Sequence, residues 1–101
     1  MGKSMQVIIS EIGSYIQNNG GIFQEWYVGI ASDPRERLFV GHKVVENGDA
    51  WIYREAMNSS EARTIEKFFL DKLVTGGGSG GGDYISKFVY AYKKSSHSYN
   101  H

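Results

Sequence analysis

One junction between a strand and a helix constrains the fold of this chain more than any other segment does. The aromatic and β-branched run at residues 26–31 has a period of two, which predicts a strand. It leads directly into a helix-start signal, with Asp33 at the N-cap, Pro34 at the first helical position and Glu36 at the third. The fold must therefore combine strands and helices in close succession.

Further segments carry signals of secondary structure. Apolar residues spaced three and four apart at 5–17 predict an amphipathic helix, and Asn58 with Glu61 forms a capping box before another helix. The expected elements are helices at 5–17, from 34 to about 39 and at 59–73, and strands at 26–31, 50–54 and 87–93. We expect one α/β (α+β) domain over residues 1–94, with a small three-stranded mixed or antiparallel sheet packed against helices, and a flexible tail at 95–101.

The composition excludes several classes of protein. With 101 residues, of which 41% are hydrophobic and 22% charged, the chain has the size and make-up of one globular domain. It has no cysteine, which excludes disulfides and thiolate metal sites and fits a cytoplasmic location. No apolar run near the N-terminus is long enough for a signal peptide or a membrane span. Eleven basic residues balance eleven acidic ones, so any contact with nucleic acid must be local.

Glu66 is the most unusual residue of the predicted helix at 59–73. At about 100° per residue, it projects inside the apolar arc of that helix. The arc consists of Ala62, Ile65, Phe69, Leu70 and Leu73. An ionised carboxylate on the buried side is costly unless it is paired, hydrogen-bonded or bound to a cation. Two interpretations stay open here: a structural ion pair with Arg37 or Arg54, or a functional site.

A second group of candidate residues surrounds the junction of strand and helix. Tyr27 shares its strand face with Gly29 and Ala31, so the small neighbours leave room either for a ligand or for a closely packed helix. Arg35 and Arg37 lie on the following helix, and His42 lies just beyond it. Taken alone, two arginines and a histidine on a short helix are typical of a solvated surface.

Taken together, these residues form a recognisable pattern. Arg37 follows the run Tyr27-Val28-Gly29, His42 comes shortly after the arginine, and the later run Glu61-Ala62-Arg63-Thr64-Ile65-Glu66 has a Glu-Ala-x-x-x-Glu setting. The pattern resembles the GIY-YIG nuclease family over roughly residues 26–72. The resemblance implies a three-stranded sheet flanked by helices, catalytic roles for Tyr27, Arg37 and His42, and Glu66 as the metal ligand.

The first signature of that family, a Gly-Ile-Tyr strand, has no match before Tyr27. Gly21-Ile22-Phe23 lies too close and ends in a side chain without a hydroxyl. Phe88-Val89-Tyr90 has the right character, and we expect its strand to neighbour the strand of Tyr27. Tyr90 then supplies the missing tyrosine in a permuted order. Tyr92 shares the strand face of Tyr90 and is the alternative. The family's late asparagine has no clear equivalent, and His42 is one residue out of the usual register.

The resemblance implies a metal-dependent endonuclease that hydrolyses phosphodiesters. Arg37 and a single divalent cation, Mg²⁺ or Mn²⁺, held by Glu66 would stabilise the charge that grows on the phosphate oxygens. Tyr27 and Tyr90 would activate the attacking water, provided that nearby cations lower the pKa of the phenol. The expected partner is nucleic acid, foremost DNA. A homodimer or a protein partner would add specificity, and no membrane association is expected.

The glycine-rich tract at 76–82 supports a different class of function. Exposed backbone N–H groups at Gly77, Gly78 and Gly80, together with Arg35, are candidates for binding phosphate. The simpler interpretation is a flexible connector, including an engineered linker. The rival function is a catalytically inactive nucleotide- or protein-binding module on the same scaffold, for example an inhibitor in conflict between phage and host.

Overall fold

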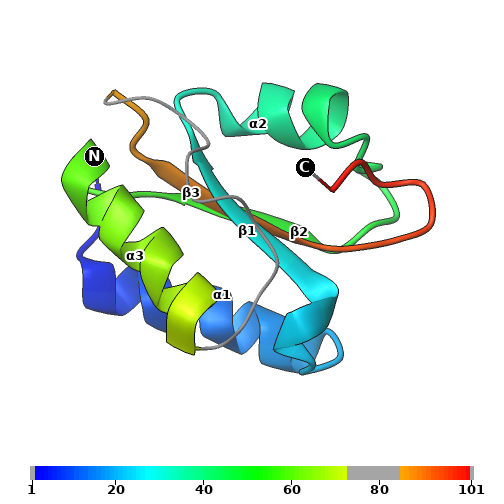
Figure 1. The fold of residues 1–101 in the computed structure, drawn as a ribbon, viewed down its shortest axis with the longest axis horizontal. Coiled ribbons are helices and arrows are strands. Elements are labelled where there is room, and N and C mark those ends of the chain that lie inside the picture. The colour runs from blue at the N-terminus through cyan, green and yellow to red at the C-terminus, as the bar shows by residue number, and fades with distance from the viewer. Residues whose placement is uncertain (1, 73–84, 101) are drawn as a thin grey trace.

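The computed structural model describes residues 2–72 and 85–100 and has the α+β architecture that the sequence predicts (Figure 1). In chain order the elements are α1 (Met5–Asn18), the 3₁₀ turn η1 (Phe23–Glu25), β1 (Trp26–Ala31), α2 (Pro34–Glu36), the π-helical turn η2 (Arg37–Gly41), β2 (Trp51–Glu55), α3 (Ser59–Lys72) and β3 (Phe88–Lys93). Each of the six predicted elements is present. Among the described residues, no helix has the length and apolar character needed to cross a membrane.

The three strands form one antiparallel sheet with the order β1-β3-β2. The last strand in the sequence is therefore the central strand of the sheet. In the ladder between β1 and β3, Tyr27 lies opposite Tyr92 and Gly29 lies opposite Tyr90. The prediction that the C-terminal strand neighbours the strand of Tyr27 is confirmed.

Helices α1 and α3 cover one face of the sheet (Figure 1). Residues four apart share a helix face, and α1 accordingly buries Ile8, Ile12 and Ile16. They pack with buried side chains of the sheet and of α3: Trp26, Val28, Ile30, Ile52, Val89, Ala91, Ala62, Ile65 and Phe69. Burying each large aliphatic side chain contributes about 1.5–3 kcal/mol, so this layer is the main core of the domain.

Helix α2 and the turn η2 lie over the opposite face (Figure 1). The Asp33 side chain accepts a hydrogen bond from the Glu36 backbone N–H at 3.2 Å, as the helix-start signal predicts. The helix extends further than expected, because α2 continues as the π-helical turn to Gly41. Leu38 of this turn packs against tyrosines of β1 and β3 and forms a second, smaller apolar cluster.

The C-terminal residues differ from the predicted flexible tail. The Tyr99 backbone N–H donates a hydrogen bond to the His42 carbonyl at 2.6 Å. His97 Nε2 lies 2.6 Å from Asp49 Oδ2, which joins the tail to the segment before β2. The terminal position alone predicted fraying, whereas backbone and side-chain contacts hold residues 95–100 against the second face of the sheet.

Candidate active site

Three tyrosines from the two adjacent strands lie together on the second face of the sheet. Because side chains alternate along a strand, Tyr27 of β1 and both Tyr90 and Tyr92 of β3 point to this face. The ring of Tyr27 is stacked 6.3 Å from that of Tyr90 and 5.3 Å from that of Tyr92, measured between centroids. The pairing of β1 with β3 thus brings the two candidate tyrosines, Tyr27 and Tyr90, into one cluster, with Tyr92 as a third member.

Gly29 makes room for Tyr90. A Cβ atom added at Gly29 would lie 2.6 Å from the Tyr90 hydroxyl oxygen and 2.7 Å from the ring carbon that bears it. No side chain larger than hydrogen fits there unless the ring moves. The space beside Tyr27, which the sequence left open to a ligand or a packed helix, therefore holds the ring of another site residue.

His42 joins the tyrosines from the end of η2. It is 1% exposed, and its ring centroid lies 4.6 Å from that of Tyr27. His42 Nε2 lies 2.7 Å from the Tyr90 hydroxyl, and Nδ1 lies 2.5 Å from the Tyr99 carbonyl oxygen. One ring nitrogen of the histidine therefore contacts the candidate catalytic hydroxyl of Tyr90, and the other contacts the C-terminal segment.

The electrostatics of Tyr90 connect it with the remaining predicted residues. Burial raises the pKa of its phenol above the ordinary value, and Tyr27 adds to the increase. Arg37 opposes it through its charge and through a hydrogen bond with Tyr90, while the charge of Glu66 raises the pKa. Among the protein groups desolvation outweighs Arg37, so the pKa of the phenol stays above its ordinary value. Tyr90 therefore keeps its proton at neutral pH unless a neighbouring base accepts it.

Glu66 is buried within α3, as helix geometry predicts. Glu66 is only 3% exposed. Burial raises the pKa of its carboxyl to about 7, and the charge of Arg63 partly offsets this increase. Arg54 does not pair with it, because Arg54 Nε lies 2.7 Å from Glu11 Oε1. Glu66 Oε2 has no hydrogen-bond partner among the described residues. The predicted ion pair of Glu66 with Arg54 is therefore wrong, and among the described residues no ion pair joins Glu66 to Arg37, the other predicted partner.

A pocket of about 340 Å³ adjoins Glu66 on the surface of α3. It is lined by Arg63, Glu66, Lys67, Leu70 and Asp71. Within residues 2–72 and 85–100, no group of three or more acidic or histidine side chains gathers in a geometry that holds a metal. A cation in this pocket could take one carboxylate from Glu66 and one from Asp71, which also lies 3.5 Å from Lys67 Nζ, with water or phosphate oxygens completing its coordination.

Arg35 is the one predicted phosphate-binding residue that lies within the described part of the chain. Arg35 Nη2 lies 2.5 Å from Glu46 Oε2, and the guanidinium lies 5.1 Å from the centre of the Phe39 ring. The three glycines of that prediction, Gly77, Gly78 and Gly80, lie outside the described residues. Arg35 therefore already has an acidic partner, which a phosphate would have to displace.

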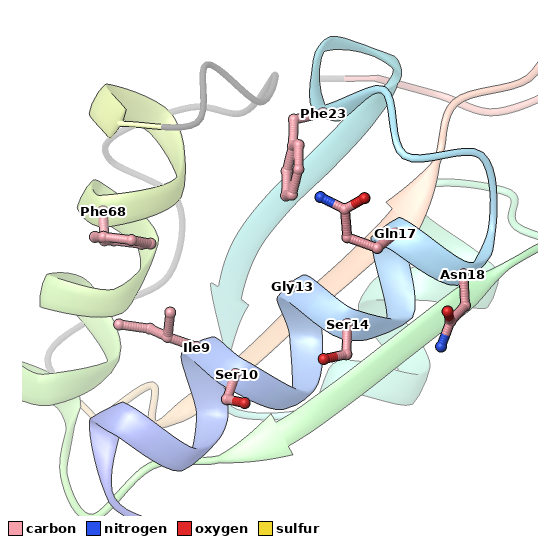
Figure 2. A pocket seen from close by; sticks show the side chains of 8 residues that line it. All are labelled: Ile9, Ser10, Gly13, Ser14, Gln17, Asn18, Phe23 and Phe68. Atoms are coloured by element: carbon pink, nitrogen blue, oxygen red, sulfur yellow. The ribbon is translucent and has the colours of Figure 1, made fainter.

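A separate pocket of about 440 Å³ lies between α1 and α3, on the other side of the sheet (Figure 2). Its lining combines apolar and uncharged polar side chains: Ile9, Ser10, Gly13, Ser14, Gln17, Asn18, Phe23 and Phe68. None of these residues is ionisable, so the pocket offers no acid or base.

Sequence reasoning missed the C-terminal members of the site. The Tyr92 hydroxyl donates to Asn100 Oδ1 at 2.8 Å and lies 3.2 Å from the Tyr99 carbonyl oxygen. The strand-face pattern pointed to Tyr92, but a contact made by a backbone carbonyl leaves no residue-type signal in the sequence.

No protein-family model, curated protein or solved structure matches the chain. Membership of the GIY-YIG nuclease family stays a prediction.

Proposed function

We propose that this chain is a metal-dependent nuclease-like domain that hydrolyses phosphodiesters of nucleic acid, foremost DNA. The observation that carries the proposal is the convergence at one hydroxyl: His42 Nε2 lies 2.7 Å from Tyr90 Oη, Arg37 hydrogen-bonds to the same group, and Tyr27 stacks beside it. Hydroxyl, base and cationic side chain within hydrogen-bond reach are what water activation and phosphate binding require.

The proposed proton path runs from water to His42. Because the pKa of Tyr90 is raised, its hydroxyl is protonated at rest and donates to His42 Nε2. As water attacks the phosphorus, Tyr90 accepts a proton from the water and passes its own to His42. The bond from phosphorus to the leaving oxygen breaks, and that oxygen takes a proton from solvent. Arg37 binds the phosphate oxygens on which negative charge grows.

Glu66 fits a role as the ligand of Mg²⁺ or Mn²⁺. A buried carboxylate oxygen without a hydrogen-bond partner is costly, and a divalent cation removes that cost while favouring the ionised form. Such a cation supplies electrostatic stabilisation of the phosphate in the transition state. Arg63 lines the same pocket and adds positive charge there, which nucleic-acid binding needs because the whole chain is neutral, whereas the charge of Lys67 is paired with Asp71 at 3.5 Å.

The test is cleavage of single-stranded and duplex DNA and of RNA by the purified full-length protein with Mg²⁺ or Mn²⁺. We expect Tyr90→Phe and Glu66→Gln to lose about 10²-fold or more of the rate, as removal of a catalytic acid–base or electrostatic group does. Glu61→Gln, on the same helix but outside its apolar arc, is the matched control and should retain full activity. Unchanged cleavage by Glu66→Gln would show that the assignment is wrong.

The rival function is the catalytically inactive nucleotide- or protein-binding module, and burial is the observation that favours it. Tyr90 and His42 are each 1% exposed, and Tyr27 is 8% exposed. Substrate can therefore reach these side chains only if the residues packed over them move. Calorimetry separates the two functions. The nuclease binds Mn²⁺ in a manner abolished by Glu66→Gln, whereas an inactive module binds no metal through Glu66.

A further inference from the structure

We propose that the C-terminal segment 95–100 is a working part of the site, and that the backbone carbonyl of Tyr99 fixes His42 in the tautomer that accepts the proton of Tyr90. The catalytic consequence rests on the proposed function. The tautomer itself does not, and it is measurable without any activity.

The tautomer follows from the chemistry of the two groups that contact the ring. A backbone carbonyl oxygen can only accept a hydrogen bond, and the Tyr99 carbonyl lies 2.5 Å from His42 Nδ1. In the neutral imidazole, Nδ1 must therefore carry the proton, since two lone pairs at this distance would repel. Nε2 is then left with its lone pair, and 2.7 Å away the Tyr90 hydroxyl is the donor to it.

Two neighbouring hydrogen bonds agree with this assignment. Arg37 can only donate, so the Tyr90 oxygen accepts from Arg37 and its hydroxyl proton is available for His42. The Tyr92 hydroxyl lies 3.1 Å from His42 Nδ1, but it has a better acceptor in Asn100 Oδ1 at 2.8 Å. Because the Tyr92 hydroxyl donates its hydrogen bond to Asn100, it does not require a lone pair on His42 Nδ1.

The segment is held on both sides of the histidine. The Tyr99 N–H donates to the backbone carbonyl of His42 at 2.6 Å, while its own carbonyl accepts from the ring of the same residue. His97 Nε2 contacts Asp49 Oδ2 at 2.6 Å and anchors the segment two residues earlier. The ring of His42 is thereby fixed against a backbone atom that is itself positioned by backbone bonds.

Because the backbone carbonyl of Tyr99 positions His42, this positioning does not require the Tyr99 side chain. Tyr99 is 56% exposed. Tyr99→Ala keeps the carbonyl and the N–H, so it is the matched control. Deletion of residues 95–101 removes both, and His97→Ala weakens the anchor while keeping the full chain.

The decisive measurement is ¹⁵N NMR of the His42 ring at a pH where the imidazole is neutral. In the wild-type protein and in Tyr99→Ala we expect a protonated Nδ1 and an unprotonated Nε2. In the deletion variant we expect a mixture of both tautomers, and in His97→Ala a smaller shift in the same direction. A protonated Nε2 in the wild-type protein, or an unchanged tautomer in both the deletion variant and His97→Ala, overturns the proposal.

Activity then separates this inference from the proposed function. If the protein is a nuclease, the deletion should lower the single-turnover rate by about 10²-fold or more, because the acceptor of the Tyr90 proton is lost. Tyr99→Ala should keep the rate. A faster rate on deletion identifies the segment as a cover rather than a positioning element and overturns its catalytic role. If no cleavage is found while the tautomer responds as expected, the proposed function fails and the positioning of His42 by Tyr99 stands.

Discussion

Glu66→Gln should make the protein more stable above pH 7, although it removes a residue of the proposed site. In the folded chain, burial raises the carboxyl pKa from 4.5 to about 7. Between these two values the folded state holds a proton that the unfolded state has released. The contribution of Glu66 to stability is therefore complete below pH 4.5 and is lost as the pH rises to 7.

The size of this stability change follows from the difference between the folded and unfolded pKa values of Glu66. A difference of about 2.5 pH units corresponds to at most about 3.4 kcal/mol at 1.36 kcal/mol per unit. The adjacent pocket admits water, which reduces the penalty of the ionised form, so we expect about 2 kcal/mol. Gln has nearly the same shape and carries no charge. At pH 4 it should match the protonated glutamate, and at pH 8 it should raise the free energy of unfolding by about 2 kcal/mol.

Urea unfolding followed by tryptophan fluorescence at pH 4 and pH 8 measures this difference. The difference between the wild-type protein and Glu66→Gln isolates Glu66 from the other titrating groups, and Glu61→Gln should show no comparable change. Mn²⁺ at 100 times its dissociation constant should raise the free energy of unfolding of the wild-type protein at pH 8 by about 2.7 kcal/mol. It should not change that of Glu66→Gln. Equal pH dependence in the wild-type protein and Glu66→Gln would refute the argument that burial controls this carboxyl.

Three further substitutions test the packing around the site by the same unfolding assay. Gly29→Ala should cost about 1–3 kcal/mol and displace the Tyr90 ring, visible as a changed aromatic NMR spectrum, because a Cβ would lie 2.6 Å from the hydroxyl oxygen; no loss would disprove the close contact. Asp33→Ala should cost about 1 kcal/mol through loss of the N-cap bond before Arg37, and an unchanged stability would argue against that cap. Ile65→Ala, in the core beneath the sheet, should cost about 2–5 kcal/mol, and a loss below 1 kcal/mol would contradict its complete burial.

Local signals in the sequence predicted the elements and one buried charge correctly. The cap at Asp33 and the alternation at 26–31 depend on neighbours within a few residues, so their outcome does not require the rest of the fold. The burial of Glu66 was predictable for the same reason, since the repeat of a helix fixes which side chains share a face.

The composition of the site depended on contacts between distant parts of the chain. The alternation of β3 places Tyr90 and Tyr92 on the same face, so the sequence could not choose between them. The register of the ladder distinguishes them, because it sets Tyr92 opposite Tyr27 and Tyr90 opposite Gly29, where the absence of a side chain admits its ring.

Other features were decided by the tertiary structure alone. Several acidic side chains of the sequence could pair with Arg54, and only the packing of α1 against β2 selects Glu11. The docking of the tail at His42 uses the carbonyl and the N–H of Tyr99, groups that almost every residue has. The sequence by itself thus determined which segments become helices and strands and which carboxylate is buried, because those follow from local geometry. The register of the ladder and the backbone contacts that complete the site required the folded chain.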